Sequence, residues 1–143
     1  MRGFPKIAFR HTELGADEIA FIRERDSFYM ASINETGWPY IQHRGGPKGF
    51  VRVIDAHTIA FPDLRGNRQY ISKGNVEHDD RVSLIFVDYP NRARLKVMAR
   101  AKILPAEPPA ERIFVLSIEA IDWNCPQHIT PRYTLDEIED LLA

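Results

Sequence analysis

Apolar and polar residues alternate along much of the chain, which is the pattern of β-strands buried on one side. The alternation is cleanest over residues 94–104 (RLKVMARAKIL). One face of this predicted strand carries Leu95, Val97, Ala99, Ala101 and Ile103, and the other face carries Arg94, Lys96, Arg100 and Lys102. The β-branched runs 81–88 (RVSLIFVD) and 112–122 (RIFVLSIEAID) predict two further strands.

Short breaks between apolar runs predict two hairpins. The first joins residues 27–34 (SFYMASIN) to 38–44 (WPYIQHR) through the turn ETG, and the second joins 50–54 (FVRVI) to 57–61 (HTIAF). No strand–helix–strand alternation indicates a parallel sheet, so an antiparallel barrel is favoured over a Rossmann fold. We therefore predict a mostly β fold, a β-barrel of six or seven antiparallel strands with flanking helices.

Three segments have helical features. Residues 16–25 (ADEIAFIRER) place acidic residues first and arginines last, as a helix dipole favours. Residues 67–76 (NRQYISKGNV) are polar enough for a short helix between strands. Residues 134–143 (TLDEIEDLLA) begin with a capping box, in which Thr134 accepts from the amide of Glu137 and the Glu137 carboxylate reaches back.

Length and composition fit one domain over residues 1–143, with an N-terminal arm (1–15) and a C-terminal tail and helix (122–143). The 19 basic and 20 acidic side chains give a formal charge of -1, which offers no global attraction for nucleic acid or membrane. One cysteine excludes an intrachain disulfide, and no segment approaches the roughly 20 apolar residues that cross a bilayer. The expectation is a soluble cytoplasmic protein.

Residues 61–75 (FPDLRGNRQYISKGN) combine basic side chains with glycines directly after a predicted strand. Arg65, Arg68 and Lys73 lie within nine residues of one another, and an arginine guanidinium can hold a phosphate at two points. A helical turn that starts near Asn67 would add free backbone amides. The pattern indicates either an anion site or a solvated basic loop, and spacing alone does not choose between them.

Two other segments have side chains suited to a ligand. Gln42, His43 and Arg44 end a strand where two glycines follow, and they offer donors and acceptors to a flat heterocycle. The alternative is a glycine-rich hairpin with exposed polar tips. In residues 122–132 (DWNCPQHITPR), Trp123 either belongs to the core or stacks on an aromatic ligand.

Metal and nucleic-acid sites are not predicted. Cys125 and His128 have a metal-like spacing, but structural zinc needs four ligands and no second pair is present. A buried structural cysteine is favoured over a nucleophile with His128 as its base. The basic run 90–96 (PNRARLK) lacks the interleaved aromatic residues of a single-strand-binding surface, so its charges are interpreted as solvated.

The order of these segments resembles the FMN-binding split barrel of the pyridoxamine 5'-phosphate oxidase family. The resemblance rests on GWPYIQHR, IAFPDLRGNRQYI and RVSLIFVDYPNRARLKVMARAKI, and it covers about residues 16–121. The tail DWNCPQHITPR resembles a group of uncharacterised bacterial members that carry the same phrase. The resemblance implies a homodimer with two FMN molecules, each in a cleft between the subunits.

The same resemblance implies roles for individual residues. Gln42, His43 and Arg44 would line the flavin ring and ribityl chain, with His43 as a hydrogen-bonding group. Asn67 and Arg68 would hold the phosphate. Arg94 would be a polar contact supplied by the other subunit. The full set of implied cofactor-binding residues is Gln42, His43, Arg44, Phe61, Pro62, Asp63, Asn67, Arg68, Arg94, Trp123, Gln127 and His128.

The implied activity is that of an oxidoreductase whose flavin transfers a hydride or electrons. Gln42 stands where the oxidase has an arginine, so the resemblance does not extend to vitamin B6 oxidation. The alternatives are a non-catalytic flavin or haem carrier or sensor on the same barrel, a deazaflavin in place of FMN, and a ligand-free interaction module. The sequence indicates neither a substrate nor an electron donor.

Overall fold

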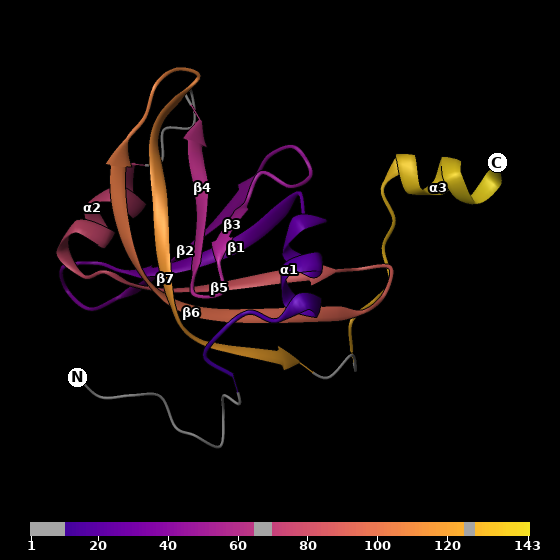
Figure 1. Ribbon diagram of the computed structural model, residues 1–143, viewed down its shortest axis with the longest axis horizontal. Coiled ribbons are helices and arrows are strands. Elements are labelled where there is room, and N and C mark those ends of the chain that lie inside the picture. The colour runs from indigo at the N-terminus through magenta and orange to yellow at the C-terminus, as the bar shows by residue number, and fades with distance from the viewer. Residues whose placement is uncertain (1–10, 65–69, 125–127) are drawn as a thin grey trace.

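The computed structural model describes residues 11–64, 70–124 and 128–143. Its helices and strands are α1 (Ala16–Arg23), β1 (Ser27–Ile33), β2 (Pro39–Gly45), β3 (Arg52–Asp55), β4 (Thr58–Leu64), α2 (Tyr70–His78), β5 (Arg81–Asp88), β6 (Ala93–Pro105), β7 (Ala110–Asn124) and α3 (Leu135–Leu142), labelled in Figure 1. The mostly β fold predicted from the sequence is confirmed.

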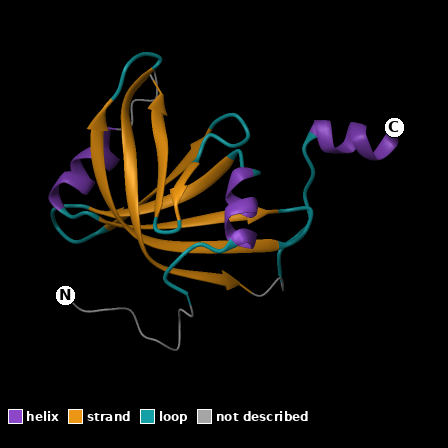
Figure 2. Ribbon diagram, viewed as in Figure 1, coloured by secondary structure: helices purple, strands orange, loops and turns teal. Residues whose placement is uncertain are grey.

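All seven strands form one antiparallel sheet in the order β2-β1-β5-β6-β7-β4-β3. The sheet curls on itself (Figure 2). As a result Arg44 of β2 contacts Asp63 of β4, although these two strands lie near opposite edges of the sheet. The Phe28 ring of β1 likewise meets the Phe61 ring of β4 at 5.0 Å. In the part of the chain that the structure describes, β2 and β3 do not pair, so the barrel is split rather than closed.

The core lies inside the curl and follows the alternation of the strands. Leu95, Val97 and Ala99 of β6 face inward and are buried, as the sequence pattern predicts. Four phenylalanines fill the centre: Phe28, Phe61, Phe86 and Phe114. Full burial of each such ring stabilises the fold by about 1.5–3 kcal/mol. The inner side of the sheet is therefore a packed core.

Three predicted boundaries are wrong by a few residues. The first helix ends at Arg23 instead of residue 25, and the second continues to His78 instead of ending at residue 76. The last strand continues to Asn124, where an irregular segment was expected from residue 122. It continues because β6 is long enough to pair with it, so that Trp123 lies opposite Leu95. Boundaries depend on a partner strand that the local sequence does not reveal.

Helix α3 has the predicted capping box. The Thr134 side chain accepts from the amide of Glu137 at 3.1 Å, and the Glu137 carboxylate accepts from the amide of Thr134 at 2.8 Å. The helix stands clear of the barrel in Figure 1, and none of its residues is buried. Across the described ranges, the helices are too short or too polar to cross a membrane.

Candidate functional site

His43 and Arg94, two of the predicted cofactor residues, lie on the outward-facing side of the curled sheet. His43 of β2 is beside Tyr29 of β1, with the two ring centroids 5.3 Å apart. Tyr29 pairs with Ile85 of β5, which pairs with Lys96 of β6. The register thus aligns these four side chains in one row across four strands.

Neighbouring rows complete this surface, which we call the outer face. It consists of Ile41 and His43 (β2), Tyr29 and Ala31 (β1), Ser83, Ile85 and Val87 (β5), and Arg94, Lys96 and Met98 (β6). Helices α1 and α2 pack on the inner side instead, through the buried Ile22 and through the Asn75–Ser32 hydrogen bond. The outer face is apolar at its centre, and β6 carries Arg94 and Lys96, with Asp122 of β7 opposite Lys96.

Arg44, Asp63 and Arg112 form a buried ionic cluster on the inner side. Arg44 Nη1 lies 3.0 Å from Asp63 Oδ1, and Arg112 Nε donates to Asp63 Oδ2 at 2.5 Å. Arg44 is 2% exposed and Asp63 is 1% exposed. The Arg44 guanidinium also lies over the Phe114 ring, 4.8 Å from its centroid. The cluster therefore joins β2, β4 and β7 through the interior.

This cluster has two guanidinium groups for one carboxylate. Burial lowers the pKa of Arg44, and the charge of Asp63 offsets part of that effect. Within the described ranges, Arg44 Nε and Nη2 make no hydrogen bond. An arginine at such a position stays charged, so the Asp63 carboxylate faces two positive charges in the interior.

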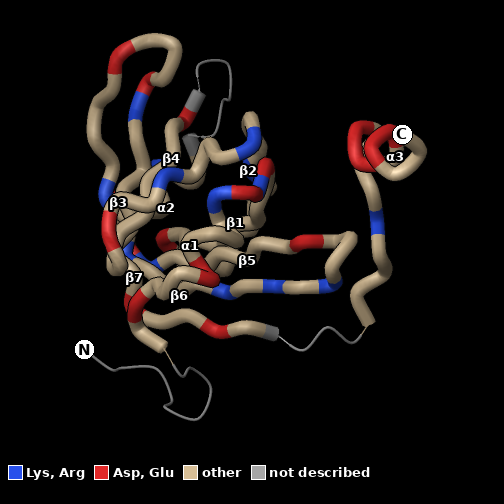
Figure 3. The backbone as a smooth tube through the Cα atoms, turned by 45° about the vertical axis from the view of Figure 1, so that its right-hand side comes forward, with Lys and Arg blue, Asp and Glu red and all other residues tan. Residues whose placement is uncertain are grey.

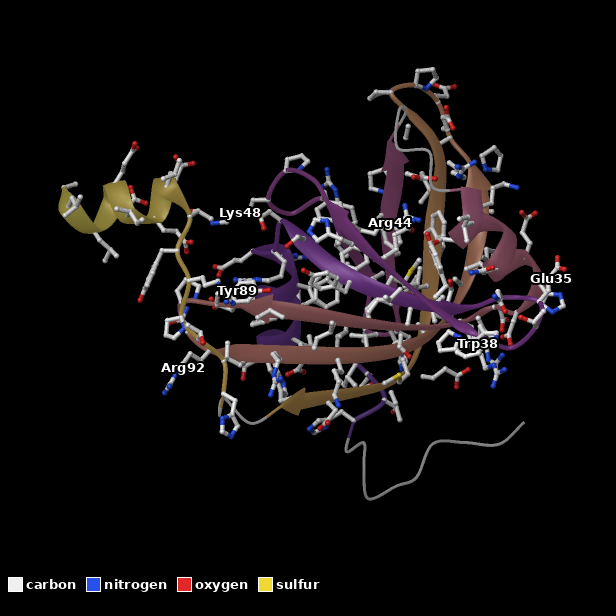
Figure 4. The ribbon with its side chains drawn as sticks, turned by 180° about the vertical axis from the view of Figure 1, so that it is seen from behind. Glu35, Trp38, Arg44, Lys48, Tyr89 and Arg92 are labelled. Atoms are coloured by element: carbon white, nitrogen blue, oxygen red, sulfur yellow. The ribbon has the colours of Figure 1, made fainter. Side chains whose placement is uncertain are left out.

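The predicted cofactor residues of β2 and β4 thus divide between the two sides of the sheet. The side chains of Arg44, Phe61 and Asp63 point into the interior, whereas His43 points outward. Pro62 lies between two inward residues on β4 and is half-buried. A flavin on the outside of the sheet could therefore contact Phe61 or Asp63 only through their backbone atoms. Figure 4 shows Arg44 within the curl of the barrel.

Gln42 connects β2 to the first turn of α2. Its Oε1 accepts a hydrogen bond from Ser72 Oγ at 2.6 Å, and its Nε2 lies 3.5 Å from the Tyr40 hydroxyl. Lys73, the next residue of α2, forms an ion pair with Glu77 at 2.6 Å. Residues 65–69, which include the anion-site candidate Arg65 and the predicted phosphate contacts Asn67 and Arg68, lie outside the described residues.

Trp123 lies away from the outer face. It pairs with the inward-facing Leu95, its Nε1 donates to Glu18 Oε2 at 2.9 Å, and its ring meets Phe21 edge-on at 4.8 Å. It is therefore held against α1, on the opposite side of β6 and β7 from Arg94. His128 is exposed with a φ of 68°. Gln127 and Cys125 lie outside the described residues.

A second feature is a cleft of about 750 Å³ between the barrel and the C-terminal tail. The barrel contributes Lys48, Asp88 and Tyr89, and α3 contributes Asp136, Glu137 and Asp140. Figure 4 shows Lys48 and Tyr89 at this end of the barrel, with Trp38 at the opposite end. The described cofactor residues are not among those lining this cleft.

A sequence model of the pyridoxamine 5'-phosphate oxidase family matches residues 17–132, which is most of the chain. The chain belongs to this family. No curated protein sequence shows a significant match. The resemblance inferred from the order of the segments is thereby confirmed at the level of the family.

Several solved structures share the fold of this chain at low sequence identity. A putative pyridoxamine 5'-phosphate oxidase from Lactobacillus delbrueckii has a TM-score of 0.63 at 17% identity, covering 79% of this chain and 96% of its own. An FMN-binding protein from Syntrophomonas wolfei has a TM-score of 0.56 at 11% identity, with 75% and 86% covered. An F420 reductase has a TM-score of 0.54 at 16% identity, with 72% and 94% covered.

Sequence reasoning missed several residues that shape both sides of the sheet. Arg112 completes the interior cluster, and its signal was a charged residue in phase with the buried Phe114 and Leu116. Tyr29 lies beside His43 on the outer face, and Ile85 lies beside Tyr29, only because of the strand pairing. No local pattern in the sequence indicates that these three residues share a row.

Proposed function

We propose that this family member binds FMN between two copies of the chain, against the outer face, and acts as an oxidoreductase. The observation that carries the proposal is the placement of His43 and Arg94 on one sheet face that none of the described helices covers, in a chain that belongs to this family. The FMN-binding protein with the same fold supports the choice of cofactor.

The chemistry of the outer face suits a flat heterocycle that carries a phosphate. Tyr29, Ile85 and Val87 provide an apolar surface for a ring, and ligand sites are mostly apolar with a few polar groups that fix orientation. The basic side chains of β6 provide positive charge for an anion. His43 provides a ring nitrogen for a hydrogen bond at the rim. The residues present therefore fit the group.

The bound flavin would supply hydride or electron transfer, and the chain would supply position and electrostatics. His43 would hold the ring by a hydrogen bond, and Gln42 would fix the first turn of α2 near the phosphate end. Arg94 would reach the flavin held by the partner copy. Asn67 and Arg68 would bind the phosphate. No described side chain is assigned as a general acid or base.

A deazaflavin is the second candidate for the cofactor. The specific observation in its favour is the F420 reductase that shares the fold. Both cofactors are flat and carry a phosphate, so the outer face suits either one. Identification of the cofactor released from the purified protein, by mass spectrometry and visible absorbance, separates the two. Protein that is colourless and gains no flavin on titration would refute both.

Activity is tested separately from binding. The flavin-loaded protein is mixed with NADPH under anaerobic conditions, and loss of the flavin absorbance is followed. We expect bleaching if the protein is a reductase that accepts this donor. A flavin that binds tightly but is reduced by no donor in a panel would indicate the carrier or sensor alternative.

The shared site is tested by Arg94→Glu, with Arg92→Glu as the matched control. Arg92 lies in the β5–β6 turn and is exposed, so its reversal changes net charge equally without altering the outer face. We expect Arg94→Glu to weaken flavin binding and Arg92→Glu to leave it within about twofold. A monomer that holds FMN as tightly as the dimer would end the shared-site proposal.

A further inference from the structure

Helix α3 has one apolar side and one acidic side. At 100° per residue, one half of the helix carries Leu135, Ile138, Leu141 and Leu142, and the other half carries Asp136, Glu137, Glu139 and Asp140. Glu139 borders the apolar side along one edge and Glu137 borders it along the other. The described residues leave this side uncovered, since its three leucines are 70–82% exposed. Isolated helices shorter than about 12–15 residues are marginal in water, so α3 needs a surface that buries its apolar side.

The tail that carries α3 is held at one end of its own barrel. Ile129 is buried, and the Arg132 guanidinium lies over the Tyr89 ring, 5.7 Å from its centroid. Thr134, the N-cap of α3, follows two residues after Arg132. Two extended residues and a helix of 8 residues together reach about 19 Å. Contact with Tyr89 therefore confines α3 to the β5–β6 end of its barrel, on the opposite side of the molecule from β3 and β4 (Figure 3).

The orientation of α3 directs its apolar side away from its own barrel. Asp136, Glu137 and Asp140 line the cleft between α3 and the barrel, whereas none of the apolar residues of the helix does. The acidic side therefore faces the chain's own body. The apolar side is presented to another molecule.

A second exposed surface lies on the outward side of β3, β4, β7 and β6, beyond the outer face. The strand pairing forms two rows across it, one of Arg52, Ala60, Val115 and Lys102 and the next of Pro62, Ile113 and Leu104. We call these residues the lateral face. Leu104 is 44% exposed, and the row beside it is apolar throughout. The lateral face is thus an apolar strip with one basic side chain at each end of its first row.

The width of the lateral face suits a helix that lies along β7. Arg52 and Lys102 stand three strand spacings apart, which is about 14 Å. A helix with its side chains is about 10–12 Å wide. Its apolar side can rest on Val115, Ile113 and Leu104 while each of its two acidic edges meets one basic side chain.

The two basic side chains of the lateral face are available to a partner. Neither Arg52 nor Lys102 forms an ion pair with any described residue, whereas Arg100, the preceding outward residue of β6, is bonded to Asp80 and Glu119. The acidic edges of α3 offer the missing counter-charges. The same carboxylates disfavour an anionic membrane surface, which attracts basic amphipathic helices.

The other carboxylates near this surface lie outside the row of Arg52 and Lys102. Asp55 is at the end of β3, where it accepts a backbone hydrogen bond, and Glu111 is near the start of β7. Asp122 lies opposite Lys96 and belongs to the region of the outer face. The row that receives the acidic edges of α3 is therefore free of carboxylates.

We propose that the apolar side of α3 docks on the lateral face of a second copy of this chain, with its acidic edges directed towards Arg52 and Lys102. In a dimer with two-fold symmetry each copy gives one helix and receives one, so the contact is made twice. This contact rests on the proposed dimer and extends it to a second region of the sheet.

The helix and the flavin occupy different surfaces. The side chains proposed to contact the flavin ring, Tyr29, His43, Ile85 and Val87, all lie on the outer face. Pro62 is the one predicted cofactor residue whose side chain lies on the lateral face, and it has no proposed contact with the flavin. A dimer can therefore hold the flavin and both helices at the same time.

The first test measures the dimer dissociation constant by sedimentation of the full chain across a dilution series, with and without added FMN. The variant Ile138→Gln/Leu141→Gln/Leu142→Gln keeps good helix formers but removes the apolar side, and Leu104→Glu places a charge in its receiving surface. We expect each to raise the dissociation constant by about tenfold or more. The matched control is Ile71→Gln, an exposed apolar residue of α2, for which we expect less than about a twofold change.

The second test locates the helix. A nitroxide is attached at Glu139→Cys in a Cys125→Ser background, and this chain is mixed with isotope-labelled chains that carry no nitroxide. We expect broadening of the amides of β6 and β7 in the labelled chains, around Lys102 and Val115. The amides around Tyr29 and Ile85 should keep their line widths.

The third test exchanges charges across the contact. Arg52→Glu and Lys102→Glu should each weaken the dimer by about two- to fivefold, the range for exposed ion pairs. Adding Glu139→Lys should restore the dimer in one of these two backgrounds and not in the other, because Glu139 borders a single edge of the helix. Arg92→Glu controls for the change in net charge and should leave the dimer unchanged.

The outcomes separate this inference from the proposed function. A dimer that binds flavin but shows no broadening between chains, and whose dissociation constant ignores the triple variant, overturns the docking of α3 and leaves the flavin proposal standing. Broadening confined to the nitroxide-carrying chain, or centred on the outer face, also overturns the docking. Rescue by Glu139→Lys in neither background does the same. A monomer at every concentration overturns both the docking and the shared site, and flavin content is read independently from the visible spectrum.

Discussion

Replacing Asp63 by asparagine should destabilise the fold more than other single changes proposed here. Asp63 is 1% exposed and is the carboxylate between Arg44 and Arg112. Asparagine is close to aspartate in size but carries no charge, so the two guanidinium groups would face each other in the interior. Removal of one partner of a buried ion pair costs about 3–5 kcal/mol, most of it from the charge left behind. For a domain of this length that corresponds to a fall in Tm of about 10–15 °C.

The measurement is thermal and urea unfolding of the flavin-free protein at pH 7, so that any change in flavin binding does not contribute. Glu77→Gln is the matched control, because it breaks an exposed ion pair with Lys73 and should cost no more than about 1 kcal/mol. Combining Arg44→Met, Asp63→Leu and Arg112→Met removes every charge of the cluster and should be far milder than Asp63→Asn alone. A loss below about 1 kcal/mol for Asp63→Asn would refute the buried-charge reasoning.

Three further predictions concern the phosphate, acid stability and metal. Arg68→Ala should weaken FMN binding by about 1.5–3 kcal/mol in a flavin titration, and an unchanged affinity would place the phosphate elsewhere. A hydrogen bond from Arg81 lowers the pKa of Asp79 to about 2. Because the folded pKa lies below the unfolded value of about 3.9, this contribution to stability is complete above that value and is lost as pH falls towards 2. For Asp79→Asn, the free energy of unfolding should therefore depend less steeply on pH between that unfolded pKa and pH 2 than it does for the wild-type protein. Cys125 and His128 should bind no zinc, and stoichiometric zinc that is lost on Cys125→Ser would contradict this.

The strands were predictable because their alternation is local. The inward residues of β6 could be predicted from a period of two alone, and the hairpins could be predicted from the short breaks between apolar runs. The capping box was predictable for the same reason, since Thr134 and Glu137 are three residues apart. The family followed from the order of several segments, because no single segment is specific on its own.

The candidate site was less predictable, because it depends on which strands become neighbours. Gln42, His43 and Arg44 are consecutive, yet they face α2, solvent and the core respectively. They were assigned to one site because they are consecutive in the sequence. In the strand, however, successive side chains point to opposite faces of the sheet. Trp123 was grouped with the ligand residues but packs on Phe21 of the first helix, a contact across the length of the chain.

The strand order also determines when the barrel can be completed. β4 comes before the middle of the chain and pairs with β3 on one side. On its other side it pairs with β7, the last strand in the sequence, where Ile59 lies opposite Leu116. The β3–β4 hairpin must therefore wait for almost the whole chain before it can join the sheet. Until then its unpaired edge is open to other chains. Sheets assembled through such distant pairings fold slowly, so we expect this protein to need protection from aggregation during synthesis most of all before β7 has left the ribosome.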